Sequence, residues 1–179
     1  STISNSLLVE IGVKEEYFGI ISFILTIVAG ISSKNQNFFH TKFRNKVLSY
    51  FSMIFTISMI VAGLSAMIIK GSNILFFIVI SALAIWNIVR APYYTLQKRY
   101  LNSFSTPSMS SKIYSACILI ESTFNTVTYW IASIMLDHMP ASISMVIIGC
   151  VFTIFFVFTL DYMKERIGLK PEEYKKSDI

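Results

Sequence analysis

Long apolar runs alternate with short polar segments along the whole chain of 179 residues. An α-helix rises about 1.5 Å per residue, so about 20 apolar residues cross a hydrocarbon core of about 30 Å. The runs are too long for membrane strands and lack their alternation of polar and apolar positions. The pattern therefore predicts an all-α membrane protein with five transmembrane helices, at 17–33, 47–69, 74–98, 113–136 and 143–163.

Short polar links separate these helices. The links at 70–73 and 137–142 contain Gly, Asn, Asp and Pro, which are typical turn residues. They predict an antiparallel meander in which consecutive helices are neighbours. We expect residues 1–12 to be the outer end of a sixth helix, and the chain to be a fragment of a larger protein. Residues 1–163 then form one bundle, and residues 164–179 form a cytoplasmic tail.

Composition and charge support this class and give it an orientation. Hydrophobic residues make up 54% of the chain and charged residues 14%, whereas soluble proteins carry about 25% charged residues. Of the 15 Lys and Arg, all but Lys14, Lys70 and Arg90 fall in the segments 34–46, 95–112 and 164–179. The positive-inside rule places these segments in the cytoplasm and the N-terminus outside. Because topology explains the net charge of +5, and no basic stripe has interleaved aromatics, we expect no nucleic-acid binding.

Two charged residues lie inside predicted spans, Arg90 in the third and Glu121 in the fourth. Each lies roughly 12 Å from the cytoplasmic surface, so neighbouring antiparallel helices could bring them together as an ion pair. Arg90 could instead extend its side chain to the interface, or handle substrate or protons. For Glu121 the interpretations are structural pairing and functional protonation, because removal from water favours the neutral carboxyl.

Polar residues at helical spacing extend both charged positions into stripes. Tyr129 could add an aromatic wall, although an interfacial or lipid-facing position is the alternative for it. Pro92 is expected to remove one backbone hydrogen bond from the span that holds Arg90. The residues expected to form a substrate or coupling path are Asn87, Arg90, Tyr94, Glu121, Asn125, Thr128 and Tyr129.

Nothing in the sequence indicates an enzyme. It contains no phosphate-binding loop, no dinucleotide-binding glycine pattern and no metal-ligand spacing. His40 and His138 are expected on opposite sides of the membrane, so they cannot share a metal ion. Cys117 and Cys150 fall within spans, where cysteine behaves as a small apolar residue. We therefore expect no catalysis, no cofactor and no metal.

Several stretches resemble the C-terminal half of a major facilitator superfamily transporter. They are GVKEEYFG, FFHTKFRNKVL and RAPYYTLQKRYLNSFSTPSMSSKIYSACILIESTFNTVTYWIASIMLD. The resemblance assigns the five spans to helices eight to twelve of that fold, and residues 1–12 to the end of helix seven. It implies that the third and fourth spans line a central cavity and that the second and fifth lie outside it. The inner-loop pattern of the family keeps only its basic positions, Lys42, Arg44 and Lys46.

The function that the resemblance implies is secondary active transport of a small solute or drug by alternating access. Its expected partners are the lipid bilayer, an N-terminal six-helix half of the same polypeptide, the solute, and protons as a candidate coupling ion. The expected location is a prokaryotic cell membrane, with the C-terminus in the cytoplasm. The alternative is a small self-contained helical membrane protein with an assembly or binding role, which would have no upstream half.

Overall fold

The computed structural model describes residues 2–43, 46–69, 73–104 and 110–166, and these residues form helices joined by short turns, without a strand. Some side chains within the helical ranges, 101–104 and 160–166 among them, are not described. The helices are α1 (Thr2–Glu10), the 3-10 helix η1 (Glu15–Tyr17), α2 (Phe18–Lys34), α3 (Gln36–Phe43), α4 (Val47–Ile68), α5 (Asn73–Phe104), α6 (Ser110–His138) and α7 (Ala141–Arg166).

Four stretches of the described chain are long and apolar enough to cross a membrane: Glu15–Lys34, Val47–Ile68, Asn73–Tyr100 and Ala141–Thr159. The all-α fold is confirmed, and these helices are consistent with a membrane protein. The predicted count of five spans is not confirmed. The span expected at 113–136 lies within α6, which is long enough but is interrupted by Glu121, Asn125 and several threonines.

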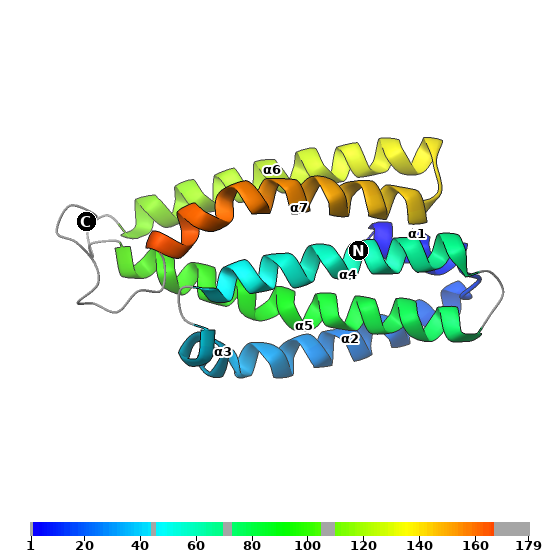
Figure 1. Ribbon diagram of the computed structural model, residues 1–179, viewed down its shortest axis with the longest axis horizontal. Helices are drawn as coiled ribbons and strands as arrows, with labels where there is room; N and C mark the ends of the chain where they lie inside the picture. Colours follow the sequence, from blue (N-terminus) through cyan, green and yellow to red (C-terminus); the bar gives the residue numbers. More distant parts are fainter. Residues whose placement is uncertain (1, 44–45, 70–72, 105–109, 167–179) are drawn as a thin grey trace.

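The helices stack side by side in the order α2, α5, α4, α7 and α6 (Figure 1). The most extensive contact joins α4 to α7, followed by α4 with α5 and α2 with α5. The contacts of α6 with α5 and α7 are much sparser. The predicted meander therefore holds closely for α4 and α5, whereas the largest contact joins two helices that are not consecutive.

Glycine makes the α4–α7 contact possible. A Cβ atom on Gly63 would lie 2.6 Å from the backbone oxygen of Ser142 and 2.7 Å from Cγ2 of Val146. A Cβ atom on Gly149 would lie 2.7 Å from Cγ1 of Ile60. In a membrane, where lipid tails are as apolar as leucine, close approach of backbones at small residues is a main source of helix association.

Two apolar clusters form the interior. The larger joins α1, α4, α5, α6 and α7, and its fully buried members include Leu7, Ala62, Val79, Leu83 and Met145. The smaller lies where α4 begins and α5 approaches its end, and consists of Val47, Leu48, Phe51, Val89, Leu96 and Tyr100.

The two ends of the bundle differ in charge. One end gathers α3, the end of α2, the start of α4, the end of α5 and the start of α6 (Figure 1). Its described charged side chains are Lys34, Lys42, Lys46, Lys98, Arg99 and Lys112. We call it the basic end. The opposite, acidic end carries Glu10, Lys14, Glu15, Glu16 and Asp137.

The shared basic end fits the predicted grouping of segments 34–46 and 95–112. Its assignment to the cytoplasm stays a prediction. Arg44 and most of the predicted tail, residues 167–179, lie outside the described residues.

Two features that the sequence did not reveal set the position of the N-terminal segment. α1 ends at Glu10 and is capped at Gly12, whose φ of 85° allows Gly12 N–H to donate to Val9 O and Val13 N–H to donate to Leu8 O, both at 2.9 Å. The Glu10 carboxylate then accepts a hydrogen bond from the backbone N–H of Ser142 at 2.9 Å, and another from the Ser142 hydroxyl. Because α7 begins at Ala141, a negative charge sits at the positive end of its helix dipole.

Candidate functional site

The middle of α5 is supported by α2. The helix continues through Pro92, which has no N–H to donate to the carbonyl of Ile88. The Ser32 hydroxyl donates to that carbonyl at 2.5 Å. Three residues after Pro92, the Thr95 hydroxyl lies 3.3 Å from the hydroxyl of Ser33 on α2. The sequence predicted the lost backbone bond at Pro92, and the structure identifies α2 as the helix that replaces it, as membrane helices with proline require.

Arg90 is exposed on α5, and its guanidinium carbon lies 5.7 Å from the ring centroid of Tyr94. Through this cation–π contact the Arg90 guanidinium interacts with a side chain of its own helix. Among the described side chains the ion pair is Lys14 with Glu16, at 3.7 Å. The structure therefore does not bring Arg90 and Glu121 together as the pair considered from the sequence.

Glu121 lies on the half-buried face of α6. Along this helix Cys117, Glu121, Asn125 and Thr128 are half-buried, and Ala132 is buried. Between positions 117 and 132 the remaining side chains are exposed. The predicted stripe of Glu121, Asn125 and Thr128 is thus the side of α6 that faces the bundle.

A described side-chain contact joins the polar sides of α5 and α6. The ammonium of Lys98 lies 5.9 Å from the ring centroid of Tyr114 of α6. Positions 90, 94 and 98 follow the spacing of one helix face, so Arg90 and Tyr94 lie on the side of α5 that carries this contact. We call Arg90, Tyr94, Glu121, Asn125 and Thr128 the α5–α6 polar face.

Two predicted residues remain. Asn87 lies three residues before Arg90, on the same face of α5, and its amide donates to the carbonyl of Leu83 on its own helix at 2.8 Å. Tyr129 is 55% exposed beside Trp130, which is 66% exposed, on the outer side of α6. The position of Tyr129 fits the alternative of an interfacial or lipid-facing side chain.

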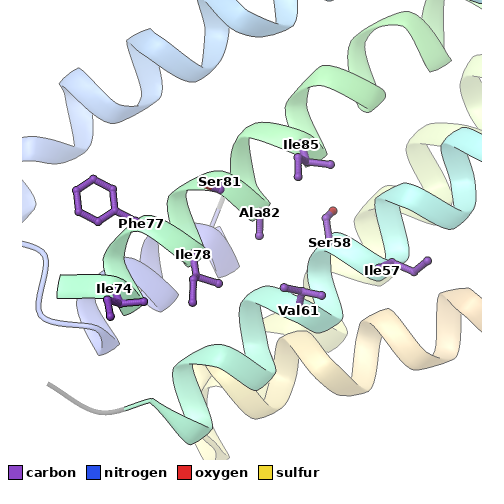
Figure 2. Close-up of a pocket in the computed structure, with 9 residues that line it drawn as sticks. All are labelled: Ile57, Ser58, Val61, Ile74, Phe77, Ile78, Ser81, Ala82 and Ile85. Carbon is purple, nitrogen blue, oxygen red and sulfur yellow. The ribbon is translucent and has the colours of Figure 1, made fainter. Parts of the chain in front are cut away.

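A separate groove of about 450 Å³ runs between α4 and α5 (Figure 2). Its lining is apolar apart from Ser58 and Ser81, and the Ser58 hydroxyl already donates to the carbonyl of Phe55 at 2.8 Å. None of the residues expected to form the substrate path lines it. Such a lining suits contact with apolar molecules. Within the described residues, no three His, Cys, Asp or Glu side chains gather at a possible metal site.

Sequence reasoning missed the residues that join α3 to α5 at the basic end. His40 Nδ1 lies 2.7 Å from the Tyr100 hydroxyl, and Arg99 Nη1 donates to Asn37 Oδ1 at 2.8 Å. The segment 34–46 reads as a basic loop because α3 is only eight residues long. The spacing of Phe39 and Phe43, four residues apart, was the available signal for a short helix with one apolar side.

Comparison of the chain with protein-family profiles, with curated proteins and with solved structures gave no match.

Proposed function

We propose that this chain forms part of a secondary transporter that moves a small solute or drug across a membrane by alternating access. The observation that carries the proposal is the α5–α6 polar face, a set of polar and charged side chains on two long helices that contact each other sparsely. Charged residues within membrane helices are costly in hydrocarbon and characteristically face a watery path or binding site. A helix that borders water also needs less hydropathy than one surrounded by lipid, which accounts for the polar sequence of α6.

The proposal gives each member of the polar face a chemical role. Glu121 is the candidate carboxyl for reversible protonation. Arg90, which has no carboxylate partner among the described side chains, is the candidate contact for an anionic group of the solute. The side-chain amide of Asn125 can donate and accept hydrogen bonds. A second six-helix half, as in the superfamily that the sequence resembles, would close the other side of the path.

Water access to the polar face tests the proposal. In a background of Cys117→Ser and Cys150→Ser, single cysteines are placed at Asn125 or Thr128 and labelled with a membrane-impermeant maleimide from each side of the membrane. We expect labelling at both positions, and from both sides in the presence of the complete transporter. Leu119→Cys and Ile120→Cys are matched controls, because these residues are 68% and 69% exposed on the outer side of the same helix. Protection at 125 and 128, or equal labelling at the controls, would refute the proposal.

The mass of the native polypeptide tests the partner. An antibody against residues 168–179 detects the product in its own membranes. A product of roughly twice the 20.3 kDa of this chain is expected if a second half precedes it. A stable product near 20.3 kDa would instead favour the self-contained assembly or binding protein.

A further inference from the structure

The short helix α3 lies at the basic end, between the end of α2 and the start of α4. The stretch Glu15–Lys34 is of membrane length, so its end at Lys34 marks where the chain leaves the hydrocarbon. Figure 1 shows α3 turned out of the line of α2, rather than continuing it. A short helix at this level can lie along the membrane surface where one side carries aromatic residues and the other carries lysines.

One side of α3 is fixed to the bundle. The ring of Phe39 packs edge-on against Phe51 of α4, with centroids 5.2 Å apart. His40 and Asn37 make the hydrogen-bonded contacts to α5 described above. These contacts determine which side chains α3 presents outward.

The outward side combines an aromatic ring with a cation. Phe38 is 58% exposed, and the Lys42 ammonium lies 5.5 Å from its ring centroid and 5.7 Å from that of Phe43. An exposed apolar ring beside a lysine suits the boundary between acyl chains and headgroups. There the ring enters the apolar layer, and the long lysine side chain reaches the phosphate level.

The charges around α3 are unbalanced. None of the described cations at the basic end has a carboxylate partner among the described side chains, whereas Lys14 at the acidic end pairs with Glu16. Lys34, Lys42 and Lys46 are all exposed. Clustered lysines next to a span attract anionic lipids. The positive-inside rule accounts for the side on which these lysines lie, but not for the exposed ring of Phe38 against Lys42.

We propose that α3 and the basic end bind the headgroup of an anionic phospholipid, with Phe38 at the level of the acyl chains and Lys34 and Lys42 at the phosphate. A lipid fits better than free phosphate, because the cations are adjacent to an exposed apolar ring at the edge of a membrane span. This inference does not depend on the proposed transport function, since lipid binding is measured without a solute.

The test is a lipid titration of the purified chain in detergent, followed by native mass spectrometry. Phosphatidylglycerol and phosphatidylcholine with the same acyl chains are compared, because they differ in headgroup charge. We expect tighter binding of phosphatidylglycerol. Each cation near a membrane surface contributes roughly fivefold in affinity, so Lys34→Gln with Lys42→Gln should weaken this binding by roughly 30-fold.

Three further variants sharpen the titration. Lys14→Gln removes a cation at the acidic end and should leave the affinity unchanged. Phe38→Ser keeps the charge and should weaken lipid binding. Lys42→Arg keeps the cation and should retain wild-type affinity, which guards against a double variant that simply misfolds.

Three outcomes would overturn the proposal. Equal affinity for the two lipids would do so, and so would unchanged affinity in the double variant. Displacement of phosphatidylglycerol by millimolar inorganic phosphate, with no loss in Phe38→Ser, would assign the basic end to free phosphate instead.

Discussion

The contact between α4 and α7 and the contact between α5 and α6 are built on opposite principles. α4 and α7 approach so closely that no Cβ atom fits at Gly63 or Gly149. α5 and α6 meet at few positions, and their polar sides carry Arg90, Tyr94 and Glu121. The first contact stabilises the bundle by close packing of two helix surfaces. The second places charge within two long helices at the cost of close packing.

The difference leads us to expect that stability and the proposed function depend on different contacts. Association of membrane helices depends on packing at small residues, so a helix rich in larger polar side chains gains less from its neighbours. Such a helix is retained where its polar groups have another use. We therefore expect substitutions at the α4–α7 contact to change the free energy of unfolding, and substitutions on the polar face to change water access and transport.

The largest effect is expected from Gly63→Ala. The added methyl group would lie 2.6 Å from a backbone oxygen, so α4 and α7 must separate. We expect a loss of about 2–3 kcal/mol in the free energy of unfolding, typical of overpacking. Thermal unfolding in detergent measures it. Gly30→Ala is the matched control, because a Cβ atom at Gly30 meets nothing within 4 Å. Equal melting temperatures for the two variants would show that the α4–α7 contact is not close-packed.

Glu10→Ala should have the next largest effect. It removes the carboxylate that accepts two hydrogen bonds from Ser142 at the start of α7. We expect a loss of about 1–2 kcal/mol, with part of it recovered in Glu10→Gln, which keeps an acceptor but not the charge. Chemical denaturation in detergent gives the value. Glu15→Gln is the control for a charge change at the same end. If Glu15→Gln costs as much, the carboxylate of Glu10 has no special role.

Ser32→Ala should cost about 1 kcal/mol, because it leaves the Ile88 carbonyl without a donor. A double-mutant cycle with Pro92→Ala isolates this bond. Alanine at position 92 restores the backbone N–H, so Ser32→Ala should cost much less in that background. Denaturation midpoints of the four proteins give the coupling energy. Additive losses would indicate that the Ser32 hydroxyl does not substitute for the missing donor.

The smallest effect on stability is expected on the polar face. Arg90→Gln and Glu121→Gln should each change the free energy of unfolding by less than about 0.5 kcal/mol, and their effects should add, because the two side chains do not form an ion pair. If the chain belongs to a transporter as proposed, Glu121→Gln should nevertheless reduce proton-coupled flux in the complete protein. Strong coupling between the two substitutions in a thermal unfolding assay would revive the ion pair. Unchanged flux and unchanged pH dependence would remove Glu121 from the path.

The sequence by itself determined the long helices and the distribution of charge, but not the short helix α3. Apolar runs predicted the α2 range to within one residue at each end, and the start of α4 at Val47. The same pattern identified Glu121, Asn125 and Thr128 as one face of a helix, because residues three and four apart lie on the same side. It also grouped the basic segments that meet at one end. These features depend on local spacing, which every stretch of sequence carries within itself.

The tertiary structure decided which helices touch and which polar groups meet. Nothing in the sequence placed α4 against α7, because the fit at Gly63 and Gly149 depends on the shapes of residues far apart in the chain. For the same reason it could not supply Ser32 as the partner of the Ile88 carbonyl, or Ser142 as that of Glu10. Equal depth suggested that Arg90 meets Glu121, but these two described side chains form no ion pair. Periodicity fixes the face and length of a helix, whereas its neighbours and their register follow from how whole surfaces pack.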